Sequence, residues 1–162
     1  QVDAFISLAG PGQPIQEVLK KQLAATLSIE MQGLVNAKLD TLAMGDTLQF
    51  APEILYSIMH PTVQPFFISW MKYDPAIEAA KLKVPPLVVN GTTDVQVSLD
   101  EVNSVAEAQP KAKVVKIKNM NHIFKPISST DMGDQLELYD DPEVAIHKKL
   151  IPALTKFIGG LK

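Results

Sequence analysis

Two residues stand out because each directly follows a segment that reads as a buried strand. Asp94 comes after the apolar run 87–89 and the turn at Asn90-Gly91. His122 comes after a second strand-like segment, residues 112–117. The carboxyl ends of neighbouring parallel strands meet at one edge of a sheet, where ligands bind and catalytic side chains lie. If these two strands are neighbours, we expect Asp94 and His122 to lie together.

An aspartate and a histidine in contact can perform proton transfer. The carboxylate accepts a hydrogen bond from one imidazole nitrogen and sets the tautomer, which leaves the other nitrogen free to take a proton from a hydroxyl nucleophile. Each residue also has a plainer interpretation. Asp94 suits a turn in which it binds its own backbone, and His122 suits a loop histidine bonded to a carbonyl. Their joint placement at two strand ends favours the catalytic interpretation.

The elements that would position this pair alternate between strands and helices. Short apolar runs bounded by Pro or Gly predict two strands, 4–8 and 86–90, and the alternation of apolar residues and lysines predicts a third, 112–117. Apolar spacing or capping signals predict helices over much of the remainder: a long amphipathic helix from 15 that bends near Gly33 or Asn36, short helices divided by prolines over 46–83, one helix from 98 to 108 and a last helix from 142 to 159. Helices alternating with buried strands predict an α/β fold with a parallel sheet.

Some local details follow from individual residues. Ser98 and Glu101 match a capping box at the start of the 98–108 helix. Residues 119–141 read as a polar loop, because they show little periodicity. His60 precedes Pro61 in a loop, and His147 falls inside the expected last helix.

Composition excludes several classes of function. The 162 residues suffice for one ordinary domain, and the net charge of −3 offers no basic face for nucleic acid or an anionic membrane. There is no cysteine, and no apolar run approaches the roughly 20 residues that span a bilayer. Cytoplasmic location is the default expectation, and secretion is not excluded because the true N-terminus is not visible.

No cofactor or metal site is predicted. The chain has no G-x-G-x-x-G or P-loop motif, and its three histidines lack carboxylate spacing for a metal. An acidic run lies around the 119–141 loop: Asp131, Asp134, Glu137, Asp140 and Asp141. It is interpreted as a solvated loop, with calcium binding as a minor alternative because the spacing differs from an EF-hand.

Three motifs together resemble a known family. They are L-A-G-P at 8–11, V-P-P-L-V-V-N-G-T-T-D-V-Q-V at 84–97 (with Asp74-Pro75 before it) and N-M-N-H-I-F at 119–124. In this order they resemble the C-terminal part of α/β-hydrolase-fold serine esterases, of the group of serine aminopeptidase-like hydrolases. The resemblance implies about three parallel strands with flanking helices, a helical cap insertion over roughly 14–83, Asp94 as the triad acid and His122 as the triad base.

The nucleophile elbow of that family, G-x-S-x-G, is absent from these residues. Ser7 lies inside a strand without flanking glycines, Ser98 suits a helix cap, and Ser128 and Ser129 fall in a loop. We therefore expect residues 1–162 to be a C-terminal fragment of a serine hydrolase, inactive by itself, whose parent acts on a small-molecule ester or related acyl substrate.

A further expectation concerns self-association. The first strand, 4–8, is apolar and uncharged, so a free edge there predicts a homo-oligomer, joined through that edge or by exchange of the 14–83 helices.

The alternative function is a non-catalytic α/β module for binding or assembly. The identity of the substrate and of the nucleophile does not follow from these residues.

Overall fold

The computed structural model describes residues 2–51 and 55–161, except for the side chain of Ser57. The chain forms two compact units. One unit contains the residues up to Gly12 together with those from Glu78 onward, and the other is Gln13–Ile77. Pro52 of the proline-divided region lies outside the described residues. No helix in the described part of the chain is both long and apolar enough to cross a bilayer.

The first unit is built on three parallel strands, β1 (Phe5–Leu8), β2 (Pro86–Gly91) and β3 (Lys113–Ile117), in the order β1-β2-β3. β2 is buried along its whole length because it has a neighbour on each side. β1 and β3 are partly exposed. The predicted α/β class and the parallel arrangement of the three strands are confirmed.

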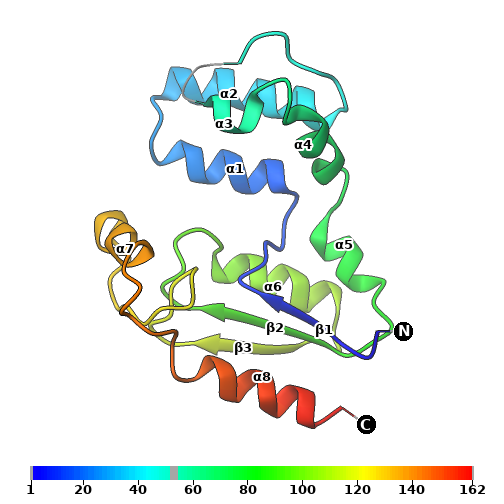
Figure 1. The fold of residues 1–162 in the computed structure, drawn as a ribbon. Helices are drawn as coiled ribbons and strands as arrows, with labels where there is room; N and C mark the ends of the chain where they lie inside the picture. Colours follow the sequence, from blue (N-terminus) through cyan, green and yellow to red (C-terminus); the bar gives the residue numbers. More distant parts are fainter. Residues whose placement is uncertain (1, 52–54, 162) are drawn as a thin grey trace. The chain divides into compact units, whose positions relative to one another are not determined.

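Helices cover both faces of this sheet (Figure 1). Successive side chains of a strand point to opposite faces, so Leu87 and Val89 pack against α8 (Leu150–Gly159), whereas Val88 packs against α6 (Leu99–Ala108). The continuous apolar run in β2 therefore reflects burial on both faces.

The second unit contains α1 (Ile15–Ala24), α2 (Ile29–Ala43), α3 (Tyr56–Met59), α4 (Gln64–Met71) and the first turn of α5 (Pro75–Ala80). A core of aliphatic, aromatic and methionine side chains joins α1, α2, α3 and α4, and Val35, Leu39 and Phe67 are among its members. This unit overlaps the helical insertion expected over 14–83, and its role as a cap stays a prediction.

The long first helix was predicted with a bend in the wrong place. The chain divides after Ala24, and Ser28 caps α2 by accepting a hydrogen bond from the Met31 N–H at 3.3 Å. Gln32 Nε2 donates to the Ala24 and Leu27 carbonyls, which satisfies the end of α1. Gly33 lies inside α2, because a capped start four residues earlier makes a break there unnecessary.

The capping box at α6 is also wrong in part. Ser98 occupies the N-cap position, but its side chain makes no capping hydrogen bond. The Glu101 carboxylate is buried and accepts the Gly12 N–H at 3.3 Å, in the loop after β1. A Cβ at Gly12 would lie 1.8 Å from the Glu101 carbonyl oxygen. The loop after β1 therefore packs directly on the start of α6, and that contact replaces the local cap.

Two helices near the C-terminus differ from expectation. The polar region 119–141 contains α7 (Met132–Tyr139), whose N-cap Asp131 accepts hydrogen bonds from the Gly133 and Asp134 N–H groups. The last helix, α8, begins at Leu150 and not at 142. His147 therefore precedes the helix, and its N–H donates to the Phe124 carbonyl at 2.6 Å.

Candidate active site

The loops after β2 and β3 approach each other very closely. The Thr92 N–H donates to the Ile117 carbonyl at 3.0 Å, and the Thr93 N–H donates to the Met120 carbonyl at 3.3 Å. A Cβ on Gly91 would lie 1.7 Å from the Met120 carbonyl oxygen. Only glycine leaves room for this approach, and it brings the residues after both strands to the same edge.

Asp94 forms three hydrogen bonds through a side chain that is 0% exposed. Its Oδ1 accepts the N–H groups of Gln96 at 2.8 Å and Val97 at 2.9 Å. Its Oδ2 lies 3.1 Å from His122 Nδ1. The turn interpretation and the expected contact with His122 are therefore compatible, because they use different oxygens of the same carboxylate; the role of Asp94 as an acid stays a prediction.

His122 lies in a tight loop after β3. Two non-glycine residues of this loop have positive φ angles, Asn119 at 58° and Phe124 at 66°. Asn121 is fully buried, and its Oδ1 accepts the Lys125 N–H at 2.8 Å. These contacts hold the backbone on both sides of His122, while the imidazole itself stays 27% exposed.

This geometry sets the chemistry of the pair. An ionised carboxylate only accepts hydrogen bonds, so Nδ1 of a neutral His122 carries the proton toward Asp94. Nε2 then has a free lone pair on a ring that solvent can reach. Such a ring can remove a proton from a hydroxyl and return it to a leaving group.

The other candidate residues are not part of this pair. Ser7 lies in β1 beside Val88, and Ser129 Oγ accepts the Asp131 N–H at 3.1 Å. Ser128 is exposed, in the segment before α7. Within residues 2–51 and 55–161, the His122 side chain bonds to Asp94 and forms no hydrogen bond to a serine or threonine hydroxyl.

The remaining histidines have other partners. His60 Nδ1 accepts the Thr62 N–H, and His147 Nδ1 accepts the Lys149 N–H, each at 3.3 Å. The acidic run lies on α7 and its two ends, and among the described residues no group of three or more histidine, aspartate or glutamate side chains is arranged to hold a metal ion.

Sequence reasoning missed a set of polar residues around the pair. Gln135 and Tyr139, both on α7, bond to the loop that carries Asp94, and Lys125, in the loop that carries His122, bonds to the C-terminal end of α7. Burial raises the pKa of Tyr139 above its usual value of 10.0, the hydrogen bond from Gln96 acts in the opposite direction, and the negative charge of Asp94 raises it further. The sequence offered one signal for α7: Asp131 is a good N-cap residue, and it lies three positions before Asp134.

No protein-family model matches the chain, and no curated protein matches it. Solved structures with a similar path include Rv0554 from Mycobacterium tuberculosis (TM-score 0.45, 13% identity), BpoC from M. tuberculosis H37Rv (0.46, 13%) and the esterase RhEst1 from Rhodococcus sp. ECU1013 (0.41, 14%). At TM-scores below 0.5, this likeness carries none of the functional argument. Each match covers 99% of this chain and 57–59% of the other, so the chain spans less than three fifths of the length of these α/β-hydrolase neighbours.

Proposed function

We propose that this chain carries the acid and the base of a serine hydrolase that acts on carboxylic esters or related acyl bonds. Asp94 is the acid and His122 the base. The observation that supports the proposal is the 3.1 Å contact between Asp94 Oδ2 and His122 Nδ1, made by residues that follow two neighbouring parallel strands. The substrate class is a small-molecule ester or acyl compound.

The two residues differ in exposure as this role requires. Asp94 is shielded, so its charge acts on the imidazole at low effective dielectric and stabilises the imidazolium when it forms. His122 is 27% exposed, which leaves Nε2 accessible to a hydroxyl and to a leaving group. One carboxylate oxygen is anchored by two backbone N–H groups, so the other keeps a fixed position relative to the ring.

The nucleophile and the oxyanion hole belong, in this proposal, to polypeptide outside these 162 residues. The serines considered above have other structural positions, and His122 contacts no hydroxyl among the described residues. These 162 residues by themselves should therefore hydrolyse no ester in a His122-dependent way.

Two assays test these two statements separately. The chain is first incubated with p-nitrophenyl esters of short and long acyl groups, beside His122→Ala and the control His60→Ala. Turnover that His122→Ala abolishes and His60→Ala keeps would place the nucleophile within this chain. The gene is then sequenced upstream of the codon for Gln1, and the complete product is treated with a serine-directed fluorophosphonate. We expect labelling of a serine in G-x-S-x-G that depends on His122; a gene encoding no such serine would refute the hydrolase proposal.

We also propose that the chain self-associates through β1. This strand is at the edge of the sheet, and its Phe5 and Ala9 N–H groups donate to the β2 side. Because strand N–H groups alternate in direction, those of Ile6 and Leu8 point to the free edge. Phe5 and Leu8 add apolar surface, 42% and 38% exposed.

Light scattering over a wide concentration range tests this association. Leu8→Lys places a charge on the edge and should shift the chain toward monomer. Ile29→Lys is the matched control, because Ile29 is 88% exposed at the start of α2, and the described residues of its unit contain no strand. A monomeric parent chain at all concentrations would exclude association through β1.

A further inference from the structure

Helix α7 has a buried polar residue at its centre that contacts the loop carrying Asp94. Gln135 is 0% exposed, and its Nε2 donates to the Thr93 carbonyl at 3.1 Å and to the Ser129 carbonyl at 2.7 Å. Figure 1 shows α7 beside the loops at the carboxyl ends of β2 and β3. Thr93 immediately precedes Asp94, so the amide holds the backbone on one side of the acid.

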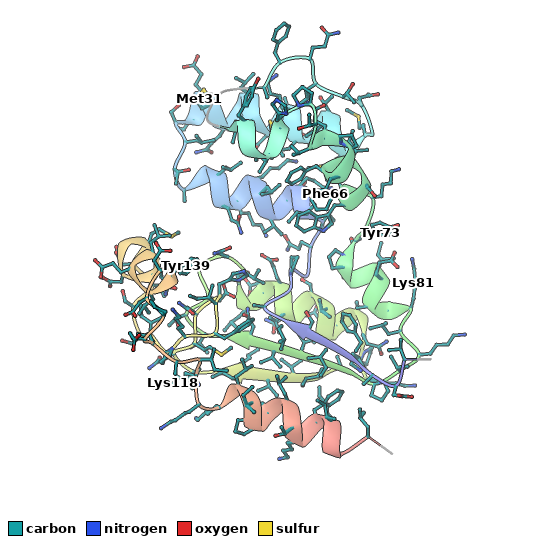
Figure 2. The ribbon with its side chains drawn as sticks, in the orientation of Figure 1. Met31, Phe66, Tyr73, Lys81, Lys118 and Tyr139 are labelled. Atoms are coloured by element: carbon teal, nitrogen blue, oxygen red, sulfur yellow. The ribbon has the colours of Figure 1, made fainter. Side chains whose placement is uncertain are left out.

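A second contact from α7 holds the other side. Gln96 Nε2 donates to Tyr139 Oη at 2.6 Å. Tyr139 is the last residue of α7 and is labelled in Figure 2. The backbone N–H of Gln96 is also one of the two donors to Asp94 Oδ1. The acid is therefore flanked by two residues that bond to the same helix.

The histidine loop is joined to α7 as well. Lys125 Nζ donates to the Leu138 carbonyl at 2.6 Å and to the Asp141 carbonyl, both at the C-terminal end of the helix. A cation there is favourable because the last carbonyls of a helix are unpaired and carry partial negative charge. The backbone of Lys125 exchanges hydrogen bonds with Asn121, the residue before His122.

From these contacts we propose that α7 positions the Asp94–His122 pair and that Gln135 is its principal positioning residue. This inference rests on the proposed function, because it assigns Gln135 a role in the geometry of that pair. The 3.1 Å contact depends on two separate loops keeping their spacing, and α7 is bonded to both of them. Gln135 makes no contact with substrate in this role; it acts through the backbone of Thr93.

The side-chain oxygen of Gln135 has no hydrogen-bond partner, which argues that this residue positions the loops more than it stabilises the fold. Its Oε1 is buried and has no hydrogen-bond partner among the described residues. A buried acceptor without a partner costs free energy, so this amide stabilises the fold less than a fully paired one. Its specific contribution is to fix two carbonyl groups, of Thr93 and Ser129, at a set distance from one helix.

The chain contains a matched control for this residue. Gln109 is also buried, and its Nε2 also donates to two carbonyls, those of Ala79 at 3.0 Å and Leu82 at 3.2 Å. These residues precede β2, whereas Asp94 follows it. Gln109→Met therefore removes the same two amide-to-carbonyl hydrogen bonds as Gln135→Met, together with the one that Gln109 Oε1 accepts from the Lys111 N–H at 3.3 Å, but at the opposite end of the strand.

The experiment measures the tautomer of His122 by ¹⁵N–¹H correlation spectra of the imidazole rings, which needs no substrate and no nucleophile. Gln135→Met should lower the Nδ1–H population of His122 several-fold, whereas Gln109→Met should leave it equal to that of the parent chain. An unchanged tautomer in Gln135→Met would overturn the proposal, and so would an equal change in both variants.

Two further outcomes are distinguishable. If Gln135→Met does not fold, Tyr139→Phe decides, because it removes only the contact with Gln96; a tautomer equal to that of the parent chain would overturn the role of α7. A parent chain in which His122 lacks the Nδ1–H tautomer would contradict the Asp94–His122 pair itself. That result would refute the proposed function and not the positioning role alone.

Discussion

Replacing Asp94 by asparagine should reverse the tautomer of His122. The two backbone N–H groups of Gln96 and Val97 require an acceptor at the Oδ1 position. The asparagine carbonyl oxygen will therefore stay there, and its NH₂ group will occupy the position of Oδ2, 3.1 Å from His122 Nδ1. A donor in place of an acceptor forces Nδ1 to accept, so the ring proton moves to Nε2. The variant then lacks the free Nε2 lone pair that a general base needs.

The size of the effect follows from the hydrogen bond that is exchanged. A hydrogen bond to a charged group contributes about 1.5–3 kcal/mol, and each 1.4 kcal/mol corresponds to about tenfold in an equilibrium. Because His122 is 27% exposed, solvent weakens the contact, and we take the lower end of that range. The parent chain should then favour Nδ1–H by about tenfold, and the variant should favour Nε2–H.

The assay is ¹⁵N–¹H correlation spectroscopy of histidine-labelled chain at about pH 9, well above the ordinary histidine pKa of about 6.5. The other two histidines serve as references whose signals should not change: His147 Nδ1 accepts the Lys149 N–H, and His60 Nδ1 lies 2.7 Å from Thr62 Oγ1 and 3.3 Å from the Thr62 N–H, so neither contacts Asp94. The His122 ring should therefore show Nδ1–H in the parent chain and lose it in Asp94→Asn, while the signals of the other two rings stay unchanged. The His122 signals are identified by their loss in His122→Gln.

Either of two results would refute this reasoning. Nε2–H at His122 in the parent chain would mean that the carboxylate does not bind the ring in solution. Nδ1–H retained in Asp94→Asn would mean that the side-chain oxygen can turn toward the histidine, so that the two backbone N–H groups do not fix its orientation.

Two further predictions concern the close approach of the loops and the phenol near Asp94. Gly91→Ala should lower the free energy of unfolding, measured in urea, by about 3 kcal/mol, at the upper end for overpacking, because its Cβ would meet the Met120 carbonyl. Gly33→Ala is the control: Gly33 lies in α2 with open space around it, so this variant should raise the free energy of unfolding by about 0.5–1 kcal/mol. Burial and then the charge of Asp94 raise the pKa of Tyr139, so the folded chain holds the phenol proton more tightly than the unfolded chain. The free energy of unfolding should therefore fall as pH rises above about 10, and Tyr139→Phe should remove that part of the slope.

Local patterns predicted the elements that bury apolar side chains. The strand β2 was found because a β-branched run between Pro and Gly has few alternatives, and β3 because its apolar residues alternate with lysines. The region before β2 was found to be helical because apolar residues recur at helical spacing. Helix α7 was missed for the opposite reason. It buries a glutamine at its centre and leaves Met132 and Leu136 about half exposed, so it has no apolar stripe to detect.

The same contrast applies to caps and helix boundaries. Ser28 was overlooked as a cap, and Ser98 was expected to cap through its side chain but does not. The sequence around Ser98 matches a capping box, but the partner that Glu101 takes is the Gly12 N–H, 89 residues away. A local sequence pattern cannot reveal a competing hydrogen-bond donor that comes close to Glu101 only when the chain packs.

By itself, the sequence determined that Asp94 and His122 follow strands of one parallel sheet, because strand propensity and the order of elements are local properties. Only the tertiary structure decided which polar atoms meet: Asp94 Oδ2 with His122 across 28 residues, and Gln135 with Thr93 across 42. A hydrogen bond requires a donor–acceptor distance that is correct to within a few tenths of an ångström. Those distances are set by how the Gly91 and Met120 backbones pack and by which loop each helix touches, and neither is encoded in the spacing of residues along the chain.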